Sequence, residues 1–171
     1  MNSANLNQFD ENGDSVLSLA IKYSPFSFEE IYHLEFDKQQ GISEDIKDHF
    51  YDDGENKKQT LLMMAIQRGL KQIAYTLLED ISKRHVTYLS FKLNHLDDKN
   101  RSAILLALQQ FDFNIAMRIA EIEYLTLVPL NAITNETLPT VLMTALNIKY
   151  EEFALPLLPH LDQKNVSRKL T

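Results

Sequence analysis

The chain has 171 residues, of which 44% are hydrophobic and 24% charged, and its formal net charge is −7. This balance is typical of a folded globular protein, and the excess of acids argues against a nucleic-acid binder, which needs lysines and arginines to neutralise phosphates. The chain has no cysteine, so disulfides, thiolate nucleophiles and cysteine-based zinc sites are excluded.

No apolar run approaches the roughly 20 residues that span a bilayer. The first ten residues are polar and lack the basic and apolar regions of a signal peptide. We therefore expect no membrane span and a cytoplasmic location, with which the absence of cysteine is compatible.

The charge is unevenly distributed along the chain. Residues 1–55 hold thirteen acids and three lysines, whereas residues 56–171 hold eleven acids and fourteen bases. The acidic part is either an ordinary solvated face or a surface that steers a basic partner toward the protein.

Four segments share one pattern, in which a polar turn is followed by Ser or Thr and then by an apolar helix with Ala at a fixed place. The alanines are 45, 42 and 38 residues apart, so the period is loose. Each unit continues into a second amphipathic helix, seen best in residues 72–79 and 114–121. The shared hydroxyl residues are Ser15, Thr60, Ser102 and Thr140, and the alanines are Ala20, Ala65, Ala107 and Ala145.

In chain order the units cover residues about 10–51, 52–95, 96–131 and 134–160, and a fifth begins at 161–171. The pattern predicts that each Ser or Thr caps its first helix and that two positions before it the chain is left-handed. Gly13 and Asn100 suit that conformation, whereas Lys58 and Leu138 predict turns of a different shape.

One stripe of each first helix is apolar and should be buried by the neighbouring helix pair, since a single pair cannot bury it alone. The stripe holds Leu17, Leu62, Ile104 and Leu142, and then Ile21, Ile66, Leu108 and Leu146.

Two connectors, residues 35–53 and 81–96, are long and carry apolar residues at helical intervals, which predicts extra helical turns. They either lengthen the turns or provide a partner-specific feature. Their spaced apolar residues are Ile42, Ile46 and Phe50 in one and Val86, Leu89 and Leu93 in the other.

The pattern Asp-x-x-Gly-x-Ser/Thr-x-Leu-x-x-Ala, followed by a helix with Ile/Phe-Ala and Leu-Leu, resembles the ankyrin repeat. The resemblance covers residues 10 to about 160 and implies an all-α ankyrin-repeat solenoid of stacked helix-turn-helix units, forming a single domain over 1–171. The family's proline is replaced by Val16, Leu61, Ala103 and Val141, and its histidine by Ser18, Met63, Leu105 and Met143.

No arrangement of residues indicates an enzyme, a metal site or a cofactor. The chain has four glycines and no glycine-rich loop. Asp10, Asn12 and Asp14 begin like a calcium loop, but the twelfth position is Ile21 rather than a bidentate Glu. The histidines lack metal-ligand spacing and stand at His33, His49, His85, His95 and His160.

The resemblance implies that another protein binds on the concave face and on the turn tips. Tyr23 and Arg68 are the residue types that most often dominate binding energy. On the first helices the implied contact residues are Lys22, Tyr23, Gln67, Arg68, Gln109, Gln110, Asn147 and Ile148. On the turn tips they are Asn56, Lys57, Gln59, Asp98, Lys99 and Arg101.

The sequence therefore predicts a non-catalytic protein-protein interaction module, monomeric on its own. Its Asn-, Gln- and Lys-rich character is similar to ankyrin proteins that intracellular bacteria deliver into host cells, which implies an effector acting on a host protein in the host cytosol. The alternative hypothesis is the targeting region of a longer enzyme whose catalytic domain lies outside this chain.

Overall fold

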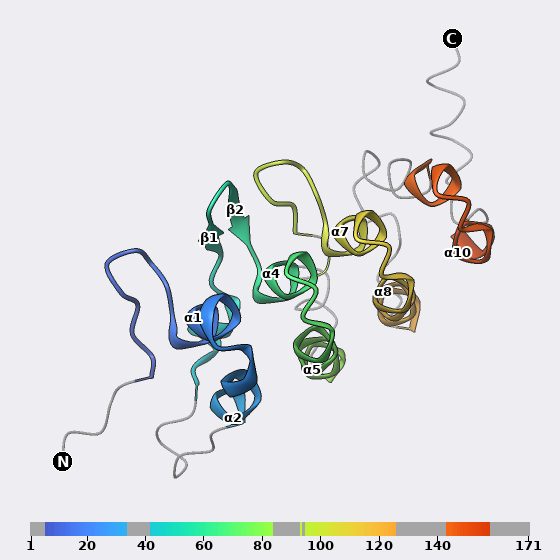
Figure 1. Ribbon diagram of the computed structural model, residues 1–171. Helices are drawn as coiled ribbons and strands as arrows, with labels where there is room; N and C mark the ends of the chain where they lie inside the picture. Colours follow the sequence, from blue (N-terminus) through green and yellow to red (C-terminus); the bar gives the residue numbers. More distant parts are fainter. Residues whose placement is uncertain (1–5, 34–41, 84–92, 94, 126–142, 158–171) are drawn as a thin grey trace, which may run out of the picture.

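The computed structural model describes residues 6–33, 42–83, 93, 95–125 and 143–157 (Figure 1). The described chain is organised as helix pairs, each with a first and a second helix joined by a short turn. The pairs are α1 (Val16–Tyr23) with α2 (Phe28–Tyr32), α4 (Leu61–Gln67) with α5 (Lys71–Ser82), and α7 (Ala103–Gln109) with α8 (Phe113–Leu125). A fourth pair has helical residues at 143–147, followed by α10 (Glu151–Leu157).

The first helices lie side by side in chain order, α1 against α4 and α4 against α7 (Figure 1). The second helices form a parallel row, in which α2 packs against α5 and α5 against α8. A 3-10 turn, η1 (Pro25–Ser27), links α1 to α2.

The expectation of an all-α ankyrin-repeat solenoid is wrong, because the described chain is a mixed structure that contains a small sheet. Strands β1 (Tyr51–Asp53) and β2 (Asn56–Gln59) pair antiparallel, with Tyr51 opposite Gln59 and Asp53 opposite Asn56. The hairpin turns at Gly54, whose φ of +62° favours glycine. It projects from the row of first helices next to α1 and α4 (Figure 1).

The three predicted helix caps within the described residues are confirmed. The side chains of Ser15, Thr60 and Ser102 accept hydrogen bonds from the backbone N–H groups of Ser18, Met63 and Leu105, respectively. Each bond pairs a donor that the first helical turn would otherwise leave without a partner. Thr140 lies outside the described residues.

The turns before these caps agree with the prediction at two positions and differ at a third. Gly13 and Asn100 have φ of +78° and +56°, as expected. The different shape predicted at Lys58 is wrong, because its φ is also +56°. The hairpin imposes the left-handed conformation there, since the Lys58 N–H donates to the Asp52 carboxylate at 3.1 Å. Leu138 lies outside the described residues.

The helices α4 and α7 and the helical segment 143–147 end in a common way that α1 does not share. The backbone N–H groups of Leu70, Asp112 and Tyr150 donate to carbonyls five residues earlier, at 2.8–2.9 Å. This bond requires a left-handed residue just before the donor, and that residue is Gly69, Phe111 or Lys149, with φ of +68°, +56° and +58°.

The predicted apolar stripe forms the core in the first three units. Its members Leu17, Ile21, Leu62, Ile66, Ile104 and Leu108 are all buried, and so are the four aligned alanines. In the fourth unit the prediction is wrong for Leu146, which is 49% exposed, and its neighbour Met143 is 62% exposed. Leu142 lies outside the described residues.

The first long connector contains the predicted helical turn, α3 (Glu44–Asp48), which buries Ile46 against the core while Ile42 is buried just before it. Phe50 stacks on His95 with ring centroids 3.9 Å apart. In the second connector Leu93 is buried, and Val86 and Leu89 lie outside the described residues.

Candidate partner-binding surfaces

The predicted contact residues lie around the hairpin and the carboxyl ends of the first helices, a surface that we name the first-helix face. Tyr23, at the end of α1, is 79% exposed. Arg68, at the end of α4, donates from its Nη1 atom to the carbonyl of Lys22, the residue before Tyr23, at 3.2 Å. The two residues that the sequence ranked first are therefore neighbours on this face.

Arg68 is held in a fixed position. Its Nε and Nη2 atoms each donate to a different oxygen of Asp53, both at 2.8 Å, and Nη1 donates to the Lys22 carbonyl at 3.2 Å. The hydrogen bonds that Arg68 donates to Asp53 are the main cause of both the raised pKa of Arg68 and the lowered pKa of Asp53. This two-bond geometry fixes the guanidinium and joins α4 to the hairpin.

Lys22 was expected to be an exposed contact residue, and this is wrong. Its side chain is 9% exposed and its ammonium donates to both carboxylate oxygens of Asp14 at 2.7 Å. It also donates to the Asp52 carbonyl at 2.9 Å. Lys22 therefore joins α1 to the hairpin.

Gln59 was also expected on the accessible tips, and this too is wrong. It is fully buried, and its Nε2 atom donates to Oε1 of Gln67 at 2.6 Å. Within the described chain the Gln59 Oε1 atom has no hydrogen-bond partner. Strand pairing turns this side chain inward, because Gln59 lies opposite the buried Tyr51.

The remaining tip residues bond to one another across neighbouring units. The Asp98 carboxylate accepts from the Lys57 N–H at 3.0 Å, and the Asn56 side-chain oxygen accepts from Lys99 at 2.9 Å and from Arg101 at 2.8 Å. Arg101 also pairs with the buried carboxylate of Asp97 at 2.6 Å. These tips form one connected surface.

The predicted residues of the third and fourth units extend the first-helix face only in part. Gln109, Gln110 and Asn147 are exposed, whereas Ile148 is half-buried and packs against the core.

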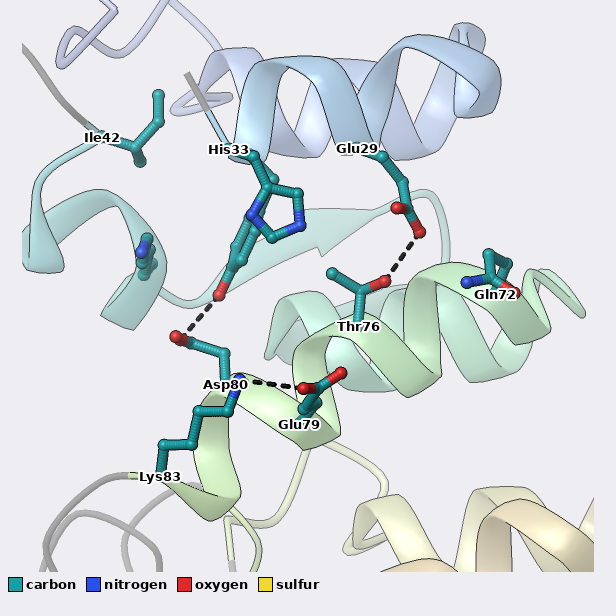
Figure 2. A pocket seen from close by; sticks show the side chains of 10 residues that line it. Glu29, His33, Ile42, Gln72, Thr76, Glu79, Asp80 and Lys83 are labelled. Carbon is teal, nitrogen blue, oxygen red and sulfur yellow. Dashed lines mark hydrogen bonds and ion pairs between the residues drawn. The ribbon is translucent and has the colours of Figure 1, made fainter. Parts of the chain in front are cut away.

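A second surface, which the sequence did not predict, is a cavity of about 520 Å³ between α2, α3 and α5 (Figure 2). It lies on the row of second helices and is therefore separate from the first-helix face. We name it the second-helix groove. Its lining residues are Glu29, Tyr32, His33, Ile42, Lys47, Gln72, Thr76, Glu79, Asp80 and Lys83.

Two hydrogen bonds between neutral hydroxyls and carboxylates cross this groove. Thr76 on α5 donates to Glu29 on α2, and Tyr32 on α2 donates to Asp80 on α5, both at 2.7 Å (Figure 2). The Lys47 ammonium lies 4.6 Å from the centre of the Tyr32 ring. At the far end of α5, Lys83 pairs with Glu79 at 2.9 Å, and that bond lowers the pKa of Glu79.

The sequence signal that could have predicted the groove is a row of polar residues along one side of α5. Gln72, Thr76, Asp80 and Lys83 recur at helical spacing on α5, so they share one side of it. The resemblance to ankyrin repeats directed the sequence analysis to the first helices. Without knowing that α2 packs on α5, Glu29 and Glu30 would be assigned to the solvated surface.

The two surfaces share one kind of polar contact. Their carboxylates are held by Thr, Tyr, Arg and Lys donors, and no group of three or more His, Asp or Glu in the described residues could hold a metal ion. Every helix in the described parts of the chain is too short or too polar to cross a bilayer.

Comparisons of the chain with protein-family models, with curated proteins and with solved structures found no match in any of the three.

Proposed function

We propose that this protein is a non-catalytic module that binds another protein through its first-helix face. The observation that carries the proposal is the 79% exposed phenol of Tyr23 next to Lys22, whose carbonyl accepts a hydrogen bond from the fixed guanidinium of Arg68. Tyr and Arg are enriched among the residues that dominate interface energies. A side chain that is already ordered before binding also loses little entropy on forming a contact.

Two further features support the proposal. The exposed amides of Gln109 and Gln110 lie on the same face and can donate and accept hydrogen bonds. The resemblance of four sequence units to ankyrin repeats also supports protein binding. The absence of cysteine is compatible with a reducing compartment such as the cytoplasm.

The test begins with the full chain as bait in a eukaryotic cell lysate, and each captured protein is then purified and titrated against wild type, Tyr23→Ala and Tyr75→Ala. Tyr75 is the matched control, because it is 37% exposed but lies on α5. We expect Tyr23→Ala to weaken binding by about 30-fold or more, the usual effect at a dominant interface residue, and Tyr75→Ala to leave it unchanged.

Circular dichroism of each variant verifies its helix content. Equal affinity of wild type and Tyr23→Ala, or equal losses in the two tyrosine variants, would rule out the first-helix face as the binding surface.

A further inference from the structure

Glu29 in the second-helix groove is a carboxylate that is held by a neutral donor. It is half-buried, and its hydrogen bond comes from the neutral hydroxyl of Thr76 at 2.7 Å. No lysine, arginine or histidine among the described residues forms an ion pair with it. A hydroxyl donor orients a carboxylate but leaves its charge and its second oxygen available for a ligand.

The groove is elongated along α5. Gln72 lies near Glu29 and Thr76, whereas Lys83 and Glu79 lie farther along the helix (Figure 2). Gln72 and Lys83 are eleven residues apart on α5, which corresponds to about 16 Å of helix. An extended chain advances about 3.3 Å per residue, so the groove matches about five residues of an extended peptide.

The lining suits a peptide rather than a single ion. At one end of the groove Gln72 can donate and accept hydrogen bonds and Glu29 can accept them, as a peptide backbone and a basic side chain require. Lys83 and Glu79 at the other end pair with each other at 2.9 Å. Tyr32 and the buried Ile42 add apolar surface for an aliphatic side-chain stem. Because no described lysine, arginine or histidine pairs with Glu29, a positively charged ligand group complements this end of the groove better than an anion does.

We propose that the second-helix groove is a second binding site, which takes an extended peptide segment of a partner with an arginine or lysine side chain bound to Glu29. The Thr76 hydroxyl holds the carboxylate in place, and the side-chain oxygen of Gln72 is a second acceptor at the same end. This site goes beyond the proposed function, because it lies on the opposite row of helices from Tyr23.

The test is an NMR titration of the full chain with a blocked pentapeptide of serine and alanine that has arginine at its centre. The matched ligand replaces arginine with citrulline, which keeps the shape and removes the charge. We expect chemical-shift changes at the backbone amides of Gln72 and Thr76, and about tenfold weaker binding of the citrulline peptide, equal to about 1.4 kcal/mol.

Two variants then distinguish a direct contact between Glu29 and arginine from attraction between the net charges of the protein and the peptide. Glu29→Gln keeps an acceptor for Thr76, and Glu30→Gln removes the same charge from the next residue, which is exposed and does not line the groove. Glu29→Gln should abolish the preference for arginine over citrulline, while Glu30→Gln should retain it. Circular dichroism of both variants verifies folding.

Three results would overturn the proposal, namely equal effects of the two glutamate variants, equal binding of the two peptides, or shifts confined to residues outside the groove. Spermidine is a further probe, and its binding without that of the peptide would make the occupant a polyamine and reject the peptide site. Because Tyr23→Ala leaves the groove intact, repeating the titration with that variant reports on this site independently of the first-helix face.

Discussion

The hydroxyl groups of Ser15 and Tyr51 lie 2.8 Å apart in the core, although 36 residues separate them in the sequence. Ser15 caps α1, and Tyr51 is the first residue of β1. The Tyr51 hydroxyl also donates to the Ile46 carbonyl in α3 at 2.6 Å. One phenol therefore connects the start of the first helix, the connector helix and the hairpin.

Replacing Tyr51 with Phe should lower the free energy of unfolding by about 1–3 kcal/mol, the cost of leaving a buried polar partner unsatisfied. Tyr51 is 1% exposed, so water cannot replace the lost bond to Ile46 without a rearrangement. Urea denaturation followed by circular dichroism measures the change. The control is Tyr75→Phe at an exposed position, which should stay within about 0.5 kcal/mol of wild type. A similar small change for Tyr51→Phe would show that these hydroxyl bonds do not stabilise the fold.

The same phenol predicts a loss of stability at alkaline pH. Burial is the main cause that raises the pKa of Tyr51 from 10.0 to about 12, and the nearby Asp14 carboxylate adds to it. A pKa that is higher in the folded state favours folding below pH 10, and this contribution is lost as the pH rises from about 10 to 12. Wild type should therefore lose its stability advantage over Tyr51→Phe across that range. Denaturation of both proteins at pH 8 and pH 11 tests this, and a constant difference would contradict it.

The ion pair of Asp53 and Arg68 predicts a loss of stability at acidic pH. Hydrogen bonds from Arg68 lower the pKa of Asp53 in the folded state, so the contribution is present above about pH 4 and is lost as the pH falls through the lowered pKa. Asp53→Asn should cost about 0.5–1 kcal/mol at pH 7, because the pair is partly exposed to solvent. The difference between the variant and wild type should be smaller at pH 2 than at pH 7.

The control for that experiment is Glu55→Gln, a change of the same charge at an exposed position in the hairpin turn. Its urea midpoint should match that of wild type at both pH values. An equal effect of the two substitutions would assign the change to net charge rather than to the contact with Arg68.

Local rules explain which parts of the fold could be predicted from the sequence. The caps at Ser15, Thr60 and Ser102 depend on bonds within four residues, and the apolar stripe depends on helical periodicity, so both are encoded in short segments. The hairpin was missed because its strands have three and four residues and are rich in Asp, Asn and Lys, which are depleted in strands.

The binding surfaces were harder to predict because they depend on contacts between distant residues. Lys22 reads as an exposed residue at the end of a helix, and its burial requires the hairpin at Asp52, 30 residues later. The second-helix groove requires α2 to pack against α5, which brings Glu29 to Thr76 across 47 residues. Helix periodicity identifies the polar side of α5 but not the element that faces it.

The backbone at Phe111 predicts a substitution that should stabilise the protein. Its φ of +56° costs a residue with a Cβ atom roughly 1–2 kcal/mol, whereas glycine adopts it readily. Glycine occupies the equivalent place, Gly69, at the end of α4. The side chain of Phe111 is 67% exposed, and its ring meets Phe113 edge-on with a centroid distance of 6.3 Å, so little packing is lost.

Phe111→Gly also makes the unfolded chain more flexible, which offsets about 0.4–1 kcal/mol of the gain. We therefore expect the free energy of unfolding to rise by a few tenths to about 1 kcal/mol. The control is Gln109→Gly at the last residue of α7, where φ is not positive, and it should lower the free energy of unfolding by up to about 1 kcal/mol. Denaturation in urea compares both with wild type. If Phe111→Gly instead destabilised the protein by more than about 0.5 kcal/mol, the contact with Phe113 would outweigh the backbone strain, and the exposed ring would be part of the packing between the α7–α8 turn and α8.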